Sequence, residues 1–111
     1  MLSSFSNTKK VLKSLGFSVD VVRNKEDVIN KVKYENYYDI IFSNNVYPDG
    51  SGSDCLKELR SLENFSTPVI IHTITENARD YFINVIGFDE YITKPLTQSK
   101  VKYALENIFK N

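Results

Sequence analysis

The sequence predicts an α/β fold, with a parallel sheet of four strands covered by helices on both faces. Residues 40–42 and 69–71 are apolar runs without a polar break, which is typical of strands buried on both faces. Segments with apolar residues at helical spacing alternate with these and two shorter strand-like runs. Alternation of this kind forms a parallel sheet through right-handed crossovers.

The first half of the chain opens with a predicted helix over residues 3–15 that ends at Gly16. A short strand over residues 17–22 follows. Asn24 then begins a second helix, with Asp27 at the reciprocal position of a capping box. The buried strand at residues 38–43 completes this half.

In the second half, Ser53 or Asp54 is expected to open a third helix. Residues 69–73 form the next strand. Thr75 is predicted to cap a helix that Gly87 closes. Residues 91–92 form the last strand, and the final helix is capped by Thr97.

Composition places the chain among ordinary globular proteins. Its 111 residues predict one domain over 1–111, with 14 basic and 14 acidic side chains. This balance favours neither nucleic acid nor an anionic membrane as partner. A single cysteine, Cys55, fits a reducing, cytoplasmic setting. We find no signal peptide and no long apolar segment.

A ligand site is expected where the strand at 38–43 ends. Asn44 and Asn45 follow it directly, and turn-forming residues occupy positions 48–52. Ligand sites of α/β proteins lie at the carboxyl ends of the strands. We therefore expect any chemistry at Asn44 and its neighbours.

Three segments, in order, resemble the receiver domain of two-component response regulators, a flavodoxin-like fold. They are DIIF with PDGSG at 39–52, PVIIHT at 68–73 and GFDEYITKP at 87–95. In that family an aspartate accepts a phosphoryl group, an acidic pair helps it to hold Mg²⁺, a Ser or Thr binds the phosphoryl oxygens and a Lys neutralises charge. Phosphoryl transfer is mostly positioning and charge stabilisation.

The resemblance places Asn44, four residues before Pro48, at the phosphoacceptor position. Thr73, Tyr91 and Lys94 correspond to the switch hydroxyl, the switch aromatic residue and the lysine, and form a residual receiver pocket. A carboxamide is a poor nucleophile, and no acidic pair precedes the first helix. We therefore expect no catalytic residue, no metal, no cofactor and no enzymatic activity.

The family spacing places the acidic pair about sixteen residues before Gly16, so the first strand is expected to be missing. Three repairs stay open. The strand at 17–22 pairs directly with 38–43, a second chain supplies backbone, or the natural product is longer. The first is preferred.

Protein–protein contact independent of phosphorylation is the function that the sequence favours, with a partner protein or a second copy of the chain. One alternative is a phosphoacceptor receiver that is truncated or uses another carboxylate, such as Asp49. A remote alternative is a flavodoxin-like nucleotide-binding protein. The family's partner surface, formed by the fourth helix, fifth strand and fifth helix, corresponds here to Asn77, Arg79, Asp80, Tyr91, Lys100, Lys102 and Tyr103.

Overall fold

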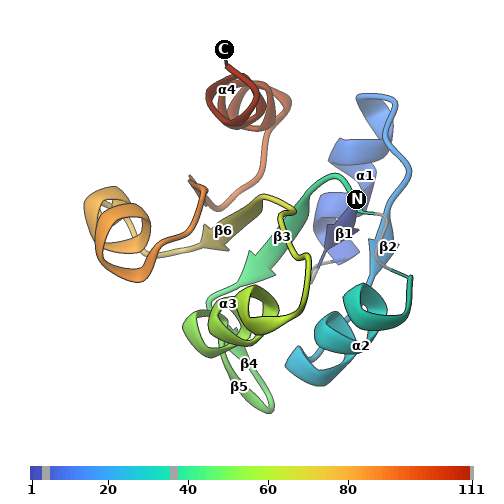
Figure 1. The fold of residues 1–111 in the computed structure, drawn as a ribbon. Coiled ribbons are helices and arrows are strands. Elements are labelled where there is room, and N and C mark those ends of the chain that lie inside the picture. The colour runs from blue at the N-terminus through green and yellow to red at the C-terminus, as the bar shows by residue number, and fades with distance from the viewer. Residues whose placement is uncertain (4–5, 36–37, 111) are drawn as a thin grey trace.

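A parallel sheet of five strands in the order β2-β1-β3-β6-β7 forms the centre of the computed structural model, which describes residues 1–3, 6–35 and 38–110 (Figure 1). The α/β class predicted from the sequence is confirmed. The strands of this sheet are β1 (Leu2–Ser3), β2 (Asp20–Val21), β3 (Ile41–Asn44), β6 (Val69–Thr73) and β7 (Glu90–Thr93). The helices are α1 (Ser6–Ser14), α2 (Lys25–Glu35), α3 (Gly52–Ser61), the short π-helix η1 (Tyr81–Ile86) and α4 (Gln98–Ile108).

The expected absence of the first strand is wrong. β1 lies between β2 and β3, with Leu2 opposite Asp20 on one side and Ile41 on the other. The prediction rested on the family spacing, which placed the acidic pair about sixteen residues before Gly16, and on a first helix that began at residue 3. α1 has nine residues, which leaves Leu2 and Ser3 for a strand. Direct pairing of residues 17–22 with residues 38–43 is therefore excluded as well.

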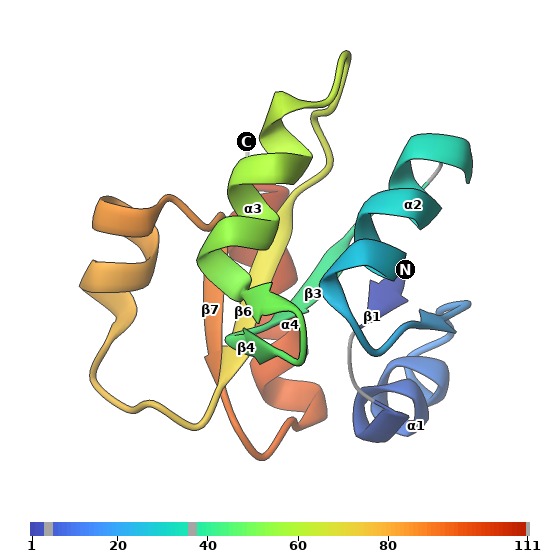
Figure 2. The same cartoon turned by 90° about the horizontal axis from the view of Figure 1, so that it is seen from below.

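Helices cover both faces of the sheet (Figure 2), and each face carries its own apolar core. The first core contains side chains of α2, α3 and η1, including Val28, Leu59 and Phe82. The second contains side chains of α1 and α4, including Leu12 and Val101. Consecutive residues of β3 and β6 alternate between the two cores, as expected for strands buried on both faces.

Helix caps follow the sequence prediction at two positions. The Asn24 side chain accepts from the Asp27 backbone N–H at 2.8 Å, and Thr97 accepts from the Lys100 N–H at 3.2 Å. At α3 the prediction of Ser53 or Asp54 is wrong by two or three residues, because Ser51 is the cap and accepts from the Asp54 N–H.

Thr75 does not cap a helix. The segment after β6 stays irregular until residue 79, and η1 follows. Gly87 ends η1 as predicted, with φ at 104°, a left-handed conformation that favours glycine.

A short antiparallel hairpin connects β3 to α3. It consists of β4 (Val46–Tyr47) and β5 (Gly50–Ser51). The sequence predicted a turn here but not the paired strands. Among the described residues, no helix has both the length and the apolar character needed to cross a membrane.

Candidate functional site

A pocket of about 310 Å³ lies at the carboxyl ends of β3, β6 and β7. The arrowheads of β3 and β6 in Figure 1 mark this edge of the sheet. The sequence placed the expected chemistry here. The pocket is lined by Asn44, Asn45, Val46, His72, Thr73, Ile74, Thr75 and Lys94.

The backbone at Asn44 is fixed by its contacts with the hairpin and with α3. Its N–H donates to the Tyr47 hydroxyl at 3.1 Å. A Cβ on Gly52 would lie 2.2 Å from the Asn44 carbonyl oxygen, so only glycine allows α3 to start this close to β3. The Gly52 N–H also donates to the Asn45 carbonyl at 2.7 Å. Asn44 therefore stands at a rigid junction.

Thr73 ends β6 and uses its hydroxyl locally. The hydroxyl accepts from the Thr75 backbone N–H at 3.2 Å and donates to the Thr75 hydroxyl at 3.3 Å. The Tyr91 hydroxyl donates to the Thr75 carbonyl. The ring of Tyr91 stacks on Phe82, with 5.8 Å between ring centroids. Thr73 and Tyr91 are thus both tied to one turn.

Positive charge gathers at the base of the pocket. Burial lowers the pKa of Lys94 below its ordinary value. Lys100 donates to the carbonyls of Thr93 and Pro95 and to the Thr93 hydroxyl, at 3.0–3.2 Å. Burial, followed by the charges of Lys94 and Lys100, lowers the pKa of His72 to about 4. His72 is therefore neutral at pH 7.

The residues around this pocket do not fit a divalent cation. Magnesium prefers carboxylate oxygens in a nearly octahedral arrangement. The lining residues offer amides, hydroxyls and an ammonium group, but no carboxylate. In the part of the chain that the structure describes, no cluster of three His, Cys, Asp or Glu side chains could hold a metal.

The predicted partner-surface residues are spread over the segment before η1, β7 and α4. Lys102 and Tyr103 are exposed on α4, and Asn77 and Asp80 are exposed before η1. The Asp80 carboxylate accepts from Asn84 at 2.7 Å. By contrast, the ammonium group of Lys100 is bound inside the chain, as described above, and does not point outward.

An ion pair beside Tyr91, between the buried Glu90 and the half-exposed Arg79, escaped the sequence prediction. Glu90 is only 1% exposed, and Arg79 reaches its two carboxylate oxygens at 2.5 and 3.0 Å. The Tyr91 N–H and the Asn107 amide also donate to it, both at 2.9 Å. Burial raises the pKa of Glu90, but these contacts outweigh it and hold the pKa below its ordinary value. An acidic residue directly before the predicted strand at residues 91–92 was the only signal in the sequence.

Comparison with known proteins gives consistent results. Residues 3–106 match the response regulator receiver domain family. Transcriptional regulatory protein CiaR of Streptococcus pneumoniae is 34% identical over 74 residues, covering 66% of this chain and 33% of CiaR. The chain thus spans about a third of the length of this relative.

Solved structures show the same fold at lower identity. Chemotaxis response regulator CheY4 of Vibrio cholerae is 16% identical with a TM-score of 0.81, covering 97% of this chain and 96% of that one. The receiver domain of sensor histidine kinase PA1611 of Pseudomonas aeruginosa, which holds a magnesium ion in its active site cleft, is 21% identical with a TM-score of 0.80. The match covers 99% of this chain and 95% of that domain.

These likenesses confirm the predicted flavodoxin-like fold, and the family match extends over most of the described sheet and its helices. The chain belongs to the response regulator receiver domain family of two-component signalling.

Proposed function

We propose that this chain is a phosphorylation-independent receiver module, one domain over residues 1–111, which signals through protein–protein contact. The observation that carries the proposal is the lining of the pocket. Asn44 stands at the end of β3, where the family resemblance expects the phosphoacceptor, and no carboxylate lines the pocket beside Lys94.

The chemistry of these groups supports this proposal. A carboxamide carries no negative charge and cannot form an acyl phosphate under mild conditions. The amide and hydroxyl oxygens around it are poor substitutes for the carboxylates that bind magnesium. The receiver domain of PA1611 holds magnesium in its active site cleft; the donor set of this chain is of a different kind.

Asp49 is a poor substitute for the missing acceptor. Its carboxylate accepts from the backbone N–H groups of Lys25 at 2.7 Å and Glu26 at 3.0 Å, at the amino terminus of α2. The Glu26 and Lys25 hydrogen bonds lower the pKa of Asp49. Asp49 lies in the β4–β5 turn and is not among the pocket residues. Phosphorylating Asp49 would disturb these two hydrogen bonds to the first turn of α2.

The contacts of Thr73 and Tyr91 support a fixed state rather than a switch. Both side chains are hydrogen-bonded to Thr75. A phosphoryl group would have to draw Thr73 away from this turn to move Tyr91. We therefore expect one conformation of this region to be presented to the partner.

The partner, or a second copy of the chain, would contact the face made by η1, β7 and α4. Tyr103, 60% exposed, and Tyr81, 52% exposed, supply aromatic surface. Lys102 and Asp80 supply charges at the edge. Aromatic groups surrounded by polar ones suit an interface of modest size.

The test is incubation of the protein with acetyl phosphate and magnesium, followed by intact-protein mass spectrometry. We expect no species heavier by about 80 Da, the mass of one phosphoryl group. A receiver domain that retains its acceptor aspartate serves as the positive control. A base-sensitive adduct on the unmodified chain would contradict the proposal, and peptide mapping would show whether Asp49 carries it.

The Asn44→Asp variant sharpens this test. It restores one carboxylate next to Lys94 but supplies no acidic pair for magnesium. We expect it to accept phosphate weakly or not at all. The proposal fails if the original chain does form the adduct, and to the same extent as Asn44→Asp. In that case residue 44 does not decide whether the protein is phosphorylated.

A further inference from the structure

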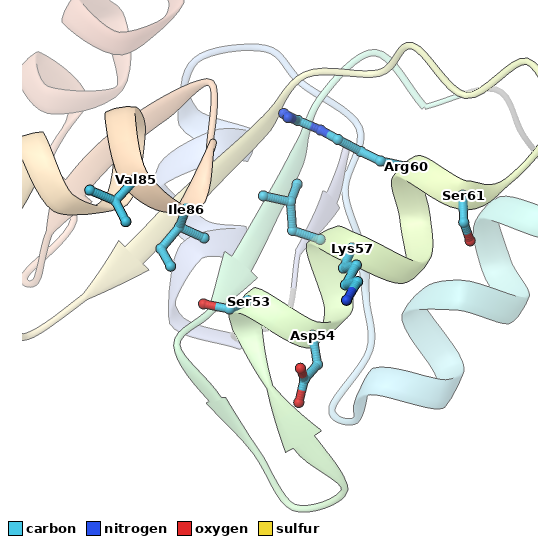
Figure 3. A pocket seen from close by; sticks show the side chains of 8 residues that line it. Ser53, Asp54, Lys57, Arg60, Ser61, Val85 and Ile86 are labelled. Atoms are coloured by element: carbon cyan, nitrogen blue, oxygen red, sulfur yellow. The ribbon is translucent and has the colours of Figure 1, made fainter.

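A groove of about 550 Å³ separates α3 from η1, away from the pocket described above. Its size is within the range of ligand-binding pockets. Leu56 from α3 and Val85 and Ile86 from η1 supply its apolar surface. Leu56 is almost fully buried, whereas Val85 is 68% exposed. Figure 3 shows Ile86 facing α3 and Ser53 pointing back towards η1.

Arg60 closes one end of this groove. It extends from α3 towards the turn after η1 (Figure 3), and its guanidinium donates to the Asp89 carboxylate at 3.1 Å. The same Asp89 oxygen accepts from the Val69 N–H at 2.7 Å. The Arg60–Asp89 ion pair at this end of the groove is therefore held in place by the backbone of β6.

Three charged residues line the groove, and two of them are compensated within the chain. Arg60 is paired with Asp89. Asp54 lies in the first turn of α3, where the amino-terminal end of the helix dipole favours a negative charge. Lys57 lies in the middle of α3 and has no hydrogen bond or ion pair with any residue that the structure describes.

We propose that this groove binds a segment of a partner protein that places a bulky apolar side chain against Leu56, Val85 and Ile86 and an adjacent carboxylate on Lys57. An apolar anchor next to a charge is the pattern by which amphipathic segments occupy grooves. The carboxylate satisfies the one uncompensated charge of the groove, and the anchor covers the exposed Val85. A basic residue next to the apolar side chain of the partner would be repelled by the positive charge of Lys57.

The groove lies on the opposite side of η1 from β7 and α4. Its occupation requires nothing of Asn44 or Lys94, so the inference holds whether or not the chain accepts phosphate. Binding in the groove also differs from the contact proposed above through the face of η1, β7 and α4. None of the partner-surface residues named from the sequence lines the groove.

The experiment is selection of a random library of twelve-residue peptides on the full chain, followed by synthesis of the enriched peptides with a fluorescent label. We expect enriched peptides to share an Asp or Glu adjacent to a large apolar residue. Amide chemical shifts of the ¹⁵N-labelled protein should change mainly on α3 and η1 when a peptide is added.

Charge reversal then tests the role of Lys57. Lys57→Glu should weaken peptide binding about tenfold or more, and Lys57→Arg should retain it. Val85→Asp should also weaken binding about tenfold. Lys10→Glu, an equal charge reversal on an exposed position of α1, is the matched control and should leave binding unchanged.

Four results would overturn the inference. They are the absence of enriched peptides, enrichment without acidic residues, binding lost in Lys102→Glu but not in Lys57→Glu, and self-association of the chain that Lys57→Glu abolishes. The third would assign the peptides to α4, and the fourth would make a second copy the occupant. Acetyl phosphate labelling, which tests the proposed function, does not affect any of these readings.

Discussion

Two charged groups on or next to β7 have contrasting surroundings. Glu90, at the first position of the strand, is buried and receives donors from Arg79, Asn107 and the Tyr91 N–H. Lys94, directly after the strand, lines a pocket whose described residues include no carboxylate. The pKa of each is lowered. For Glu90 this favours the charged form, and for Lys94 it favours the neutral one.

The difference shows which charge the fold depends on. A buried charge with a complete set of donors holds elements together, and here Glu90 connects Arg79, two residues before η1, with Asn107 of α4. Burial lowers the pKa of Lys94 and so disfavours its charged form. We therefore expect its ammonium group to contribute less to stability than the carboxylate of Glu90.

Glu90→Gln should cause the largest loss of stability among these tests, about 3 kcal/mol in the free energy of unfolding. The amide directs N–H groups at Arg79 and leaves the guanidinium without its carboxylate. Urea unfolding measures the change. Asp80→Asn, which alters an exposed acid nearby, is the control and should change stability by less than about 0.5 kcal/mol. Equal effects would remove the distinction between a buried and an exposed acid.

His72 should make stability depend on pH by about 2–3 kcal/mol. Its folded pKa of about 4 lies below the ordinary value of 6.5, so the unfolded chain binds more protons between these values. Stability from this group is present above pH 6.5 and is lost as the pH falls towards 4.

Unfolding of the original chain and His72→Leu from pH 4 to pH 7 checks this point. The chain has one histidine, so the variant should show a smaller slope between pH 4.5 and 6.5, whatever its absolute stability. The carboxylates contribute equally to both proteins. Parallel curves would show that His72 is accessible to protons in the folded state.

Tyr91→Phe should cost about 1 kcal/mol, the typical net value of one hydrogen bond. The variant removes the hydroxyl that donates to the Thr75 carbonyl and keeps the stacking on Phe82. Thermal unfolding measures the loss, and Tyr103→Phe on exposed α4 is the control. No loss in Tyr91→Phe would mean that the Thr75 turn does not hold the ring in place.

Lys94→Met should have the smallest effect, within about 1 kcal/mol of the original chain and in either direction. Methionine keeps the length of the side chain and removes a charge that burial disfavours. Urea unfolding beside Glu90→Gln completes the comparison. A loss as large as that of Glu90→Gln would mean that Lys94 is a structural residue like Glu90.

Periodicity predicted the parallel α/β sheet because the buried strands are pure apolar runs. It placed Asn44 at the end of a buried strand, where ligand sites of parallel sheets lie. The family resemblance, not periodicity, added Thr73 and Lys94, and all three line one pocket. Periodicity missed β1 because two residues, Leu2 and Ser3, provide too short a pattern for any period.

The other features that the sequence prediction got wrong or missed depend on tertiary contacts. Thr75 has the chemistry of a helix cap, but its backbone N–H and carbonyl are used by Thr73 and Tyr91. From the sequence alone, Glu90 is expected to be a surface residue. In the structure it is buried, and its carboxylate accepts from Arg79 and Asn107, which belong to other elements. Asn45 was expected beside Asn44, but no pattern in the sequence indicated that Val46 and Ile74 would line the pocket.

The two-residue length of β1 has a consequence for hydrogen exchange. β1 pairs with each neighbour over two residue pairs, whereas β3 with β6 and β6 with β7 pair over four each. Local opening follows the regions with the fewest backbone hydrogen bonds. Amides of β2 and the helices flanking it should therefore exchange with deuterium sooner than those of β6. The sheet would open locally at the pairings of β1 before the molecule unfolds as a whole.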